Sequence, residues 1–117
     1  MIEKIKQLRS EGIKCYLATN QEKYRTKYMR ETMDFENIFD GVFSSAELEC
    51  KKPEKEFFQK VLDSLEINGE EVLFFDDDQR NINGAKSSGI KSFLYVGFDK
   101  LEEIIGNWIS AFTGVTK

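Results

Sequence analysis

The sequence predicts an α/β fold in which helices pack on a parallel β-sheet. Short apolar runs alternate with amphipathic stretches along the 117 residues, and strands separated by helices pair in parallel through right-handed crossovers. Three of the apolar runs end in polar residues, which is typical of sheets that bind ligands beyond the carboxyl ends of their strands. The length is that of one domain, so we expect residues 1–117 to form a single one.

The first half of the chain predicts helices and strands in alternation. Ile2, Ile5 and Leu8 recur at helical spacing ahead of Gly12, which is well placed to end a helix. Asn20 stands before a second amphipathic stretch and is of a type that caps helices. The expected elements are a helix at 1–11, a strand at 13–18, a helix from Asn20 to about Thr32, a helical turn at 35–39 and a strand at 41–45.

The second half continues the alternation after a polar loop. Pro53 suits the first turn of a helix, and an apolar stripe follows at 57–65. Asp99 and Glu102 form a variant capping box at the start of the last helix, whose stripe extends to Phe112. The expected elements are a helix at 53–68, a strand at 71–75, a helix at 79–88 closed by Gly89, a strand at 91–96 and a helix from Asp99.

The aromatic residues on these stripes and strands are expected in the core. For Tyr24 and Tyr28, which lie four residues apart on one side of a helix, core packing is favoured over lining a substrate entrance. The expected core residues are Phe57, Phe58, Phe74, Phe75, Phe93 and Trp108.

Charge and hydropathy narrow the class of partner. The net charge of −4 and the scattered lysines argue against nucleic acid, which needs a basic surface patch. The sequence contains no apolar run near the roughly 20 residues of a membrane span, and Met1–Ser10 is amphipathic and charged, unlike a signal peptide. We therefore expect a cytoplasmic protein without a membrane partner.

Cysteine and histidine usage limits the chemistry. Cys15 lies inside an expected strand and Cys50 beside two lysines, and residues so differently placed are expected to be free thiols. The chain contains no histidine, which excludes Ser-His-Asp and Cys-His activation and every His-ligated metal site. Chemistry would depend on carboxylates, lysine, hydroxyl groups and a hard metal ion.

The polar strand ends form an ordered set. One strand ends in Thr19-Asn20, Lys52-Pro53 opens a helix, and a later strand ends in Asp76-Asp77 with Asn81 following. This order resembles the haloacid dehalogenase-like (HAD) hydrolase superfamily, whose members are mostly magnesium-dependent phosphatases. The resemblance covers roughly Met1 to Val96 and implies a three-layer α/β/α Rossmann-like core.

The resemblance implies a role for each matching residue. Thr19 and Lys52 would be catalytic, since Thr19 would hydrogen-bond a phosphoryl oxygen and Lys52 would neutralise its charge. Together with Asn20 they would bind a small phosphorylated substrate. Asp76 and Asp77 would hold Mg²⁺, which prefers carboxylate oxygens, and Asn81 would brace the acidic loop.

The sequence departs from the family pattern in one respect. The family's nucleophile is the first Asp of an Asp-x-Asp pair on an earlier strand, and we expect that strand and the cap domain to be missing at the N-terminus. Asp76–Asp78 is a poor substitute, because Arg80 stands where the family has Thr or Val. The chain alone is therefore expected to be inactive, with Mg²⁺ bound weakly.

A missing central strand would leave two strand edges exposed, and exposed edges invite pairing. We expect residues 13–18 and 72–75 to pair directly, or a partner chain to fill the gap by self-association. A receiver domain of two-component signalling is excluded, because receivers place the acids before the Thr and the lysine last. A non-catalytic α/β module for binding or assembly stays open as the alternative.

Overall fold

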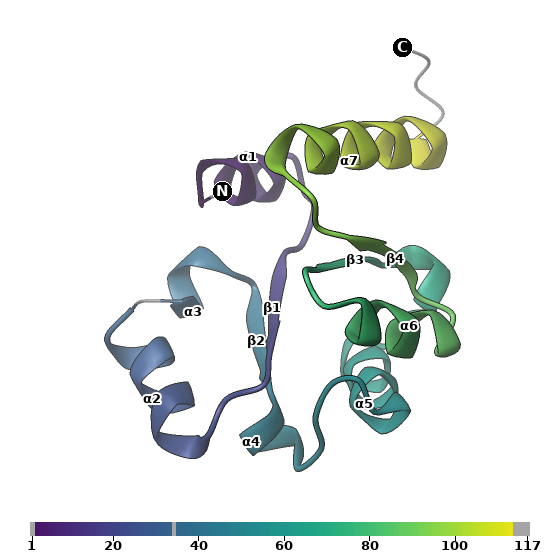
Figure 1. Cartoon of the computed structure of the whole chain (residues 1–117). Coiled ribbons are helices and arrows are strands. Elements are labelled where there is room, and N and C mark those ends of the chain that lie inside the picture. Colours follow the sequence, from purple (N-terminus) through teal and green to yellow (C-terminus); the bar gives the residue numbers. More distant parts are fainter. Residues whose placement is uncertain (1, 34, 114–117) are drawn as a thin grey trace. The chain divides into compact units, whose positions relative to one another are not determined.

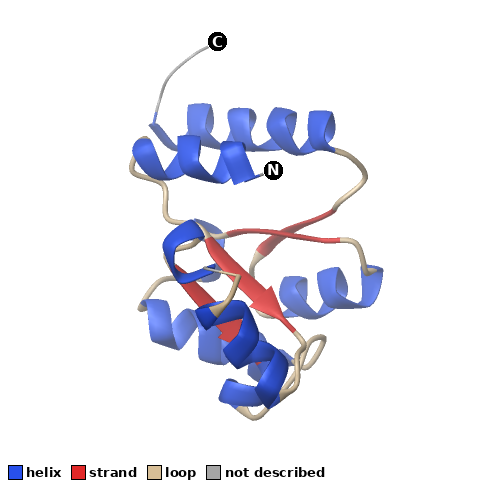
Figure 2. Ribbon diagram, turned by 90° about the vertical axis from the view of Figure 1, so that its left-hand side faces the viewer, coloured by secondary structure: helices blue, strands red, loops and turns tan. Residues whose placement is uncertain are grey.

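The computed structural model describes residues 2–33 and 35–113. It divides into two compact units, Met1–Glu66 (unit 1) and Ile67–Lys117 (unit 2). Each unit combines helices with a pair of parallel strands (Figures 1 and 2), which confirms the α/β prediction. That all 117 residues form one domain stays a prediction. Within 2–33 and 35–113, no helix is both long enough and apolar enough to cross a membrane.

Unit 1 is organised around two short strands. Its elements are α1 (Ile2–Ser10), β1 (Tyr16–Thr19), α2 (Lys23–Glu31), α3 (Phe35–Ile38), β2 (Gly41–Ser44), α4 (Ser45–Leu48) and α5 (Lys55–Leu65). β1 and β2 pair in parallel, with Tyr16 opposite Gly41 and Thr19 opposite Ser44. A Cβ atom at position 41 would lie 3.0 Å from Cδ1 of Tyr16, so glycine leaves room for the tyrosine ring.

The end of α3 and the loop that leads from it to β2 are hydrogen-bonded to α1 and to the segment before β1. Arg9 donates to the carbonyls of Asn37 and Ile38 at 2.8 and 2.9 Å and pairs with the Asp40 carboxylate at 3.2 Å. Asp40 also accepts from the Cys15 N–H at 2.6 Å and donates its own N–H to the Cys15 carbonyl at 2.7 Å. These bonds hold the chain at Cys15, and β1 begins only at the next residue.

The three longer helices of unit 1, α1, α2 and α5, each bury some of their residues. On α5, Phe57 and Phe58 are fully buried with their rings edge to face at 5.4 Å, as predicted. On α2, Thr26 and Met29 are buried instead of the tyrosines. Core packing of Tyr24 and Tyr28 was therefore a wrong prediction, since their exposed fractions are 82% and 47%.

Unit 2 places one helix against its strand pair. Its elements are η1 (Gly69–Glu71), β3 (Leu73–Asp76), α6 (Gln79–Ser87), β4 (Lys91–Leu94) and α7 (Phe98–Thr113). β3 and β4 are parallel, with Leu73 opposite Lys91 and Asp76 opposite Leu94. Ile82 and Ala85 of α6 are fully buried. Gly89 follows α6 with a φ of +81°, which confirms it as the residue that ends the helix.

A second glycine in unit 2 marks a close approach of two backbones. A Cβ atom at Gly69 would lie 2.6 Å from the carbonyl oxygen of Gly89. Real Cβ atoms do not come that near to an oxygen, so the segment before β3 can lie against the end of α6 only because residue 69 has no side chain.

The aromatic residues of unit 2 are less buried than predicted. The rings of Phe75 and Phe93 lie 6.0 Å apart on paired strands, but Phe93 keeps 38% of its surface exposed and is not core. Phe74, Phe75 and Trp108 are half-buried. Among the described ladders β4 pairs only with β3, so its outer side lacks a covering strand. The side chain of Phe112 lies outside the residues whose side chains the structure describes.

Several helix boundaries differ from the prediction. Glu22, not Asn20, caps α2, and its carboxylate accepts the Arg25 N–H at 2.7 Å. Pro53 lies in a turn before α5, which begins at Lys55. A helical turn, α4, occupies part of the expected polar loop because the Ser44 hydroxyl caps it.

Two further expectations concern strand edges and thiols. In the part of the chain that the structure describes, ladders join β1 to β2 and β3 to β4 in two separate sheets. Direct pairing of 13–18 with 72–75 and self-association through a partner strand both stay predictions. Cys15 and Cys50 are free thiols, as predicted.

Candidate functional site

The predicted site residues fall on both units, as two groups at strand ends. Unit 1 carries Thr19, Asn20 and Lys52, and unit 2 carries Asp76, Asp77 and Asn81. Thr19 is the last residue of β1, and Asp76 is the last residue of β3. Both groups thus occupy the carboxyl end of a parallel strand, where α/β folds bind ligands.

In unit 1 the ammonium of Lys52 reaches the end of β1. Lys52 Nζ donates to the carbonyl oxygen of Ala18 at 3.0 Å, although 34 residues separate them. Ala18 precedes Thr19, so the structure brings the predicted lysine to the same strand end as the predicted hydroxyl. Sequence reasoning named both residues but did not foresee the carbonyl that receives the lysine.

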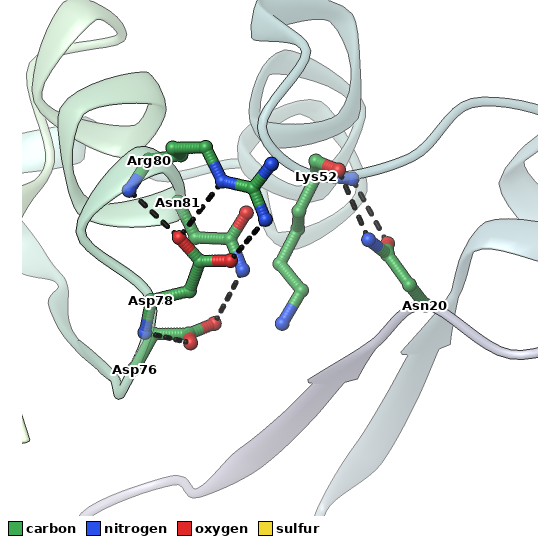
Figure 3. Close-up of polar contacts among 6 residues, drawn as sticks. All are labelled: Asn20, Lys52, Asp76, Asp78, Arg80 and Asn81. Carbon is green, nitrogen blue, oxygen red and sulfur yellow. Dashed lines mark hydrogen bonds and ion pairs between the residues drawn. The ribbon is translucent and has the colours of Figure 1, made fainter.

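Asn20 links the same strand end to the backbone of Lys52. Its side-chain Nδ2 donates to the Lys52 carbonyl at 2.9 Å, and its Oδ1 accepts the Lys52 N–H at 2.9 Å (Figure 3). One amide side chain thus pairs with both the N–H and the C=O of one residue, which belong to two consecutive peptide groups. This engagement explains why Asn20 does not cap α2.

Neighbouring residues hold the loop that follows β1. The Ser45 hydroxyl accepts the Gln21 N–H at 3.0 Å and donates to the Gln21 carbonyl at 3.2 Å. The hydroxyls of Thr26 and Ser44, both buried, lie 2.6 Å apart. The serines were noted as a polar strand end, but no signal in the sequence revealed these bonds across about 20 residues.

An open hollow of about 360 Å³ lies beside this loop in unit 1. Its lining is mostly polar and carries more negative than positive side chains. The residues are Gln21, Glu22, Ser45, Ala46, Glu49, Cys50, Lys51 and Glu54. Sequence reasoning did not identify it, because it forms from two loops that are distant along the chain.

In unit 2 the carboxylate of Asp76 is held by two donors. Oδ1 accepts the Asp78 N–H at 2.9 Å, and Oδ2 accepts Nδ2 of Asn81 at 3.0 Å (Figure 3). Asn81 is itself buried, with 8% of its surface exposed. The predicted bracing of the acidic loop by Asn81 therefore has a direct geometric counterpart.

The other two acids of the run have different surroundings. Asp77 is exposed at the bend after β3. Asp78 caps α6 by accepting the Arg80 N–H at 2.9 Å, and its carboxylate pairs with the Arg80 guanidinium at 2.8 Å. The cap and the ion pair account for the third carboxylate, and leave Asp76 and Asp77 as the acids that suit a cation.

The donor set in unit 2 fits Mg²⁺. Two adjacent carboxylates, one fixed and one exposed, match an ion that is usually held by one or two carboxylates and keeps several waters. Among the described residues no group of three or more Cys, Asp or Glu side chains is placed to hold a metal ion. A cage made by the protein alone is therefore absent from this part of the chain.

Known proteins resemble this chain over most of its length. Residues 1–95 match the family described as haloacid dehalogenase-like hydrolase. The sesquiterpene phosphatase astK of Aspergillus oryzae is 32% identical over 91 residues, covering 77% of this chain and 46% of that protein. The phosphorylated carbohydrates phosphatase of Thermotoga maritima is 29% identical over 89 residues, covering 76% and 41%. The chain thus spans about half the length of these relatives.

A solved structure agrees with the sequence relatives. The wild-type HAD family enzyme bt-2542 of Bacteroides thetaiotaomicron, in complex with magnesium and inorganic phosphate, has a TM-score of 0.71 and 26% identity to this chain. The match covers 80% of this chain and 50% of that one. The predicted fold and family are therefore confirmed.

Proposed function

We propose a function from one premise, which is that the chain belongs to the haloacid dehalogenase-like hydrolase family. The whole protein of which these residues are the core would hydrolyse a small phosphate ester with the help of Mg²⁺. Two relatives named as phosphatases and a similar enzyme bound to magnesium and phosphate support this assignment.

The observation that carries the proposal is the position of the Lys52 ammonium. Its bond of 3.0 Å to the Ala18 carbonyl puts a positive charge at the end of β1, beside the residue that ends the strand with a hydroxyl. Hydrolysis of a phosphate ester concentrates negative charge on the phosphoryl oxygens, so catalysis depends mainly on positioned donors and cations.

Each residue has a defined task in this proposal. Thr19 donates its hydroxyl to a phosphoryl oxygen, and Lys52 stabilises the charge on that group. Asp76 and Asp77 hold Mg²⁺, which supplies further positive charge for the transfer when it is bound. Asn81 and the Asp78 N–H keep the Asp76 carboxylate in one orientation.

The nucleophile is the part that these residues do not supply. The only Asp-x-Asp pair in the sequence is Asp76 and Asp78, and Asp78 is occupied as the cap of α6 and the partner of Arg80. We therefore propose that the 117 residues alone bind the ligands of the reaction but turn over little ester.

A second candidate is a non-catalytic module that keeps the fold for binding or assembly. The occupied Asp78 favours it, because a chain whose acids serve only local structure would show the same cap and ion pair. The two candidates differ in whether Asp76 and Asp77 bind a cation.

Magnesium titration of the chain, followed by NMR or calorimetry, distinguishes them. The enzyme core should bind Mg²⁺ at millimolar concentration and should lose at least about tenfold in affinity in Asp76→Asn. Asp99→Asn, which removes an exposed carboxylate of the same unit, is the matched control and should change nothing. Absence of Mg²⁺ binding in the wild type would contradict the enzymatic proposal.

Turnover of p-nitrophenyl phosphate tests whether the 117 residues alone hydrolyse a phosphate ester. We expect no activity of the 117-residue chain above that of Asp76→Asn. A wild-type rate that exceeds the variant's would show that the chain supplies its own nucleophile.

A further inference from the structure

We propose that Asn20 is a positioning residue that fixes Lys52 at the end of β1, and that it is not a ligand of the substrate. The inference rests on the proposed function, because it assigns Asn20 a task within the phosphoryl-binding group. It replaces the expectation that Asn20 binds substrate together with Thr19 and Lys52.

The first argument is that both the nitrogen and the oxygen of the Asn20 amide pair with the backbone of Lys52. The oxygen accepts the Lys52 N–H and the nitrogen donates to the Lys52 carbonyl, both at 2.9 Å. A side-chain amide can pair with the N–H and the C=O of one residue because it carries a donor and an acceptor on separate atoms, which serine and aspartate do not. The pairing uses one of the two amide hydrogens and one of the two acceptor sites of the oxygen, and it fixes the orientation of the amide.

The second argument is that Asn20 is held from both sides. Thr19 lies in the ladder opposite Ser44, and the Gln21 N–H is bound by the Ser45 hydroxyl at 3.0 Å. The amide therefore projects from a backbone that has little freedom, although Asn20 is exposed. An anchored residue can fix its partner, whereas a mobile one cannot.

The third argument concerns the other end of the contact. The Lys51 N–H binds the Glu54 carboxylate at 3.0 Å, and the Glu54 N–H binds the Lys51 carbonyl at 2.9 Å. The turn that carries Lys52 is thus rigid in itself but joined to β1 through Asn20 and through its own ammonium at Ala18. Both ends of a long, rotatable side chain are tied to the same strand end.

A double-mutant cycle with inorganic phosphate as the probe, in the presence of Mg²⁺, tests this on the 117-residue chain. We expect Asn20→Ala to weaken phosphate binding about tenfold, as changes in the outer partners of a ligand residue commonly do. In a Lys52→Met background the same change should cost less than about twofold, because the residue it acts through is gone. Asn83→Ala, an exposed amide of α6, is the control.

The outcomes separate positioning from direct contact. If Asn20→Ala lowers the phosphate affinity by the same factor with and without Lys52, the inference is overturned. A residue that contacts phosphate directly keeps its effect when Lys52 is absent. An unchanged affinity in Asn20→Ala would overturn it as well. If the alanine variant does not fold, Asn20→Ser enters the same cycle.

If the wild type binds no phosphate, the proposed function is refuted but the positioning role of Asn20 is not. In that case, ¹³C NMR relaxation of the lysine side chains tests the positioning role. Lys52 should be more rigid than its exposed neighbour Lys51 and should become equally mobile in Asn20→Ala. Equal mobility of both lysines in the wild type, or a Lys52 unaffected by the substitution, would overturn the positioning role by itself.

Discussion

In both strand-end groups an asparagine amide hydrogen-bonds a residue of the proposed site, but in opposite settings. In unit 2, Asn81 is buried and lies five residues from its partner Asp76. In unit 1, Asn20 is exposed and lies 32 residues from its partner Lys52. The buried, local contact should contribute mainly to stability, whereas the exposed, long-range contact should contribute mainly to the geometry of the site. We therefore expect burial and sequence separation, more than the chemistry of the amide, to decide what each asparagine contributes.

The largest expected effect is that of Asn81→Ala on the stability of unit 2. The change removes a donor to an ionised carboxylate from a buried position and should cost about 2 kcal/mol of unfolding free energy. Urea unfolding followed by the fluorescence of Trp108, the only tryptophan, measures it. Asn83→Ala should stay within about 0.5 kcal/mol of the wild type. If both variants lose the same free energy of unfolding, the buried hydrogen bond of Asn81 does not contribute more to stability than an exposed amide.

Thr26→Val tests whether the larger loss expected for Asn81→Ala comes from burial or from its position in unit 2, because Thr26 is buried in unit 1. The Thr26 hydroxyl lies 2.6 Å from that of Ser44, and both residues are buried in unit 1. The isosteric change should cost about 1.5 kcal/mol, since the buried Ser44 hydroxyl loses its bond to Thr26 and keeps the one from the Ala46 N–H at 3.3 Å. Hydrogen exchange of unit 1 measures the loss. Thr32→Val, at an exposed position, is the control, and a similar loss there would exclude burial as the cause.

Asp78→Ala tests a local contact at a half-buried position. It removes the cap of α6 and should cost about 1 kcal/mol. Arg80→Ala removes only the ion pair, whose guanidinium side chain is 81% exposed, and should lower the unfolding free energy less than Asp78→Ala does. Chemical denaturation read by Trp108 compares the two. A larger loss in Arg80→Ala would assign the stabilisation to the ion pair.

Asn20→Ala should have a much smaller effect on stability than Asn81→Ala. Water can replace both hydrogen bonds of this exposed side chain. We therefore expect the free energy of unfolding to fall by about 0.5 kcal/mol, which is near the lower limit for a hydrogen bond. Protection of the Lys52 amide against hydrogen exchange should nevertheless fall clearly. A global loss as large as that of Asn81→Ala would reverse the comparison between the two asparagines.

The sequence predicted what depends on local pattern. The alternation of strands and helices, the burial of Phe57 and Phe58 and the glycine after α6 all follow from residues within one element or one turn. Periodicity and short-range polar contacts suffice for such features.

What depends on long-range contacts was missed or misassigned. Asn20 has the residue type and the position of a helix cap, but the Lys52 peptide competes for its amide and the cap passes to Glu22. Phe93 has the pattern of a core strand, but its burial depends on which strands lie beside β4. Local propensity cannot rank these competing partners, because they are separated by tens of residues.

The approach of Gly69 to Gly89 has a consequence for changing this protein by mutation. Because both sides of that contact are main chain, no rearrangement of neighbouring rotamers can accommodate even a methyl group at position 69. In a library of variants randomised at position 69, nearly all folded proteins should carry glycine there, whereas nearby surface positions should accept most substitutions. Redesign of the segment that leads into β3 must therefore treat this position as fixed.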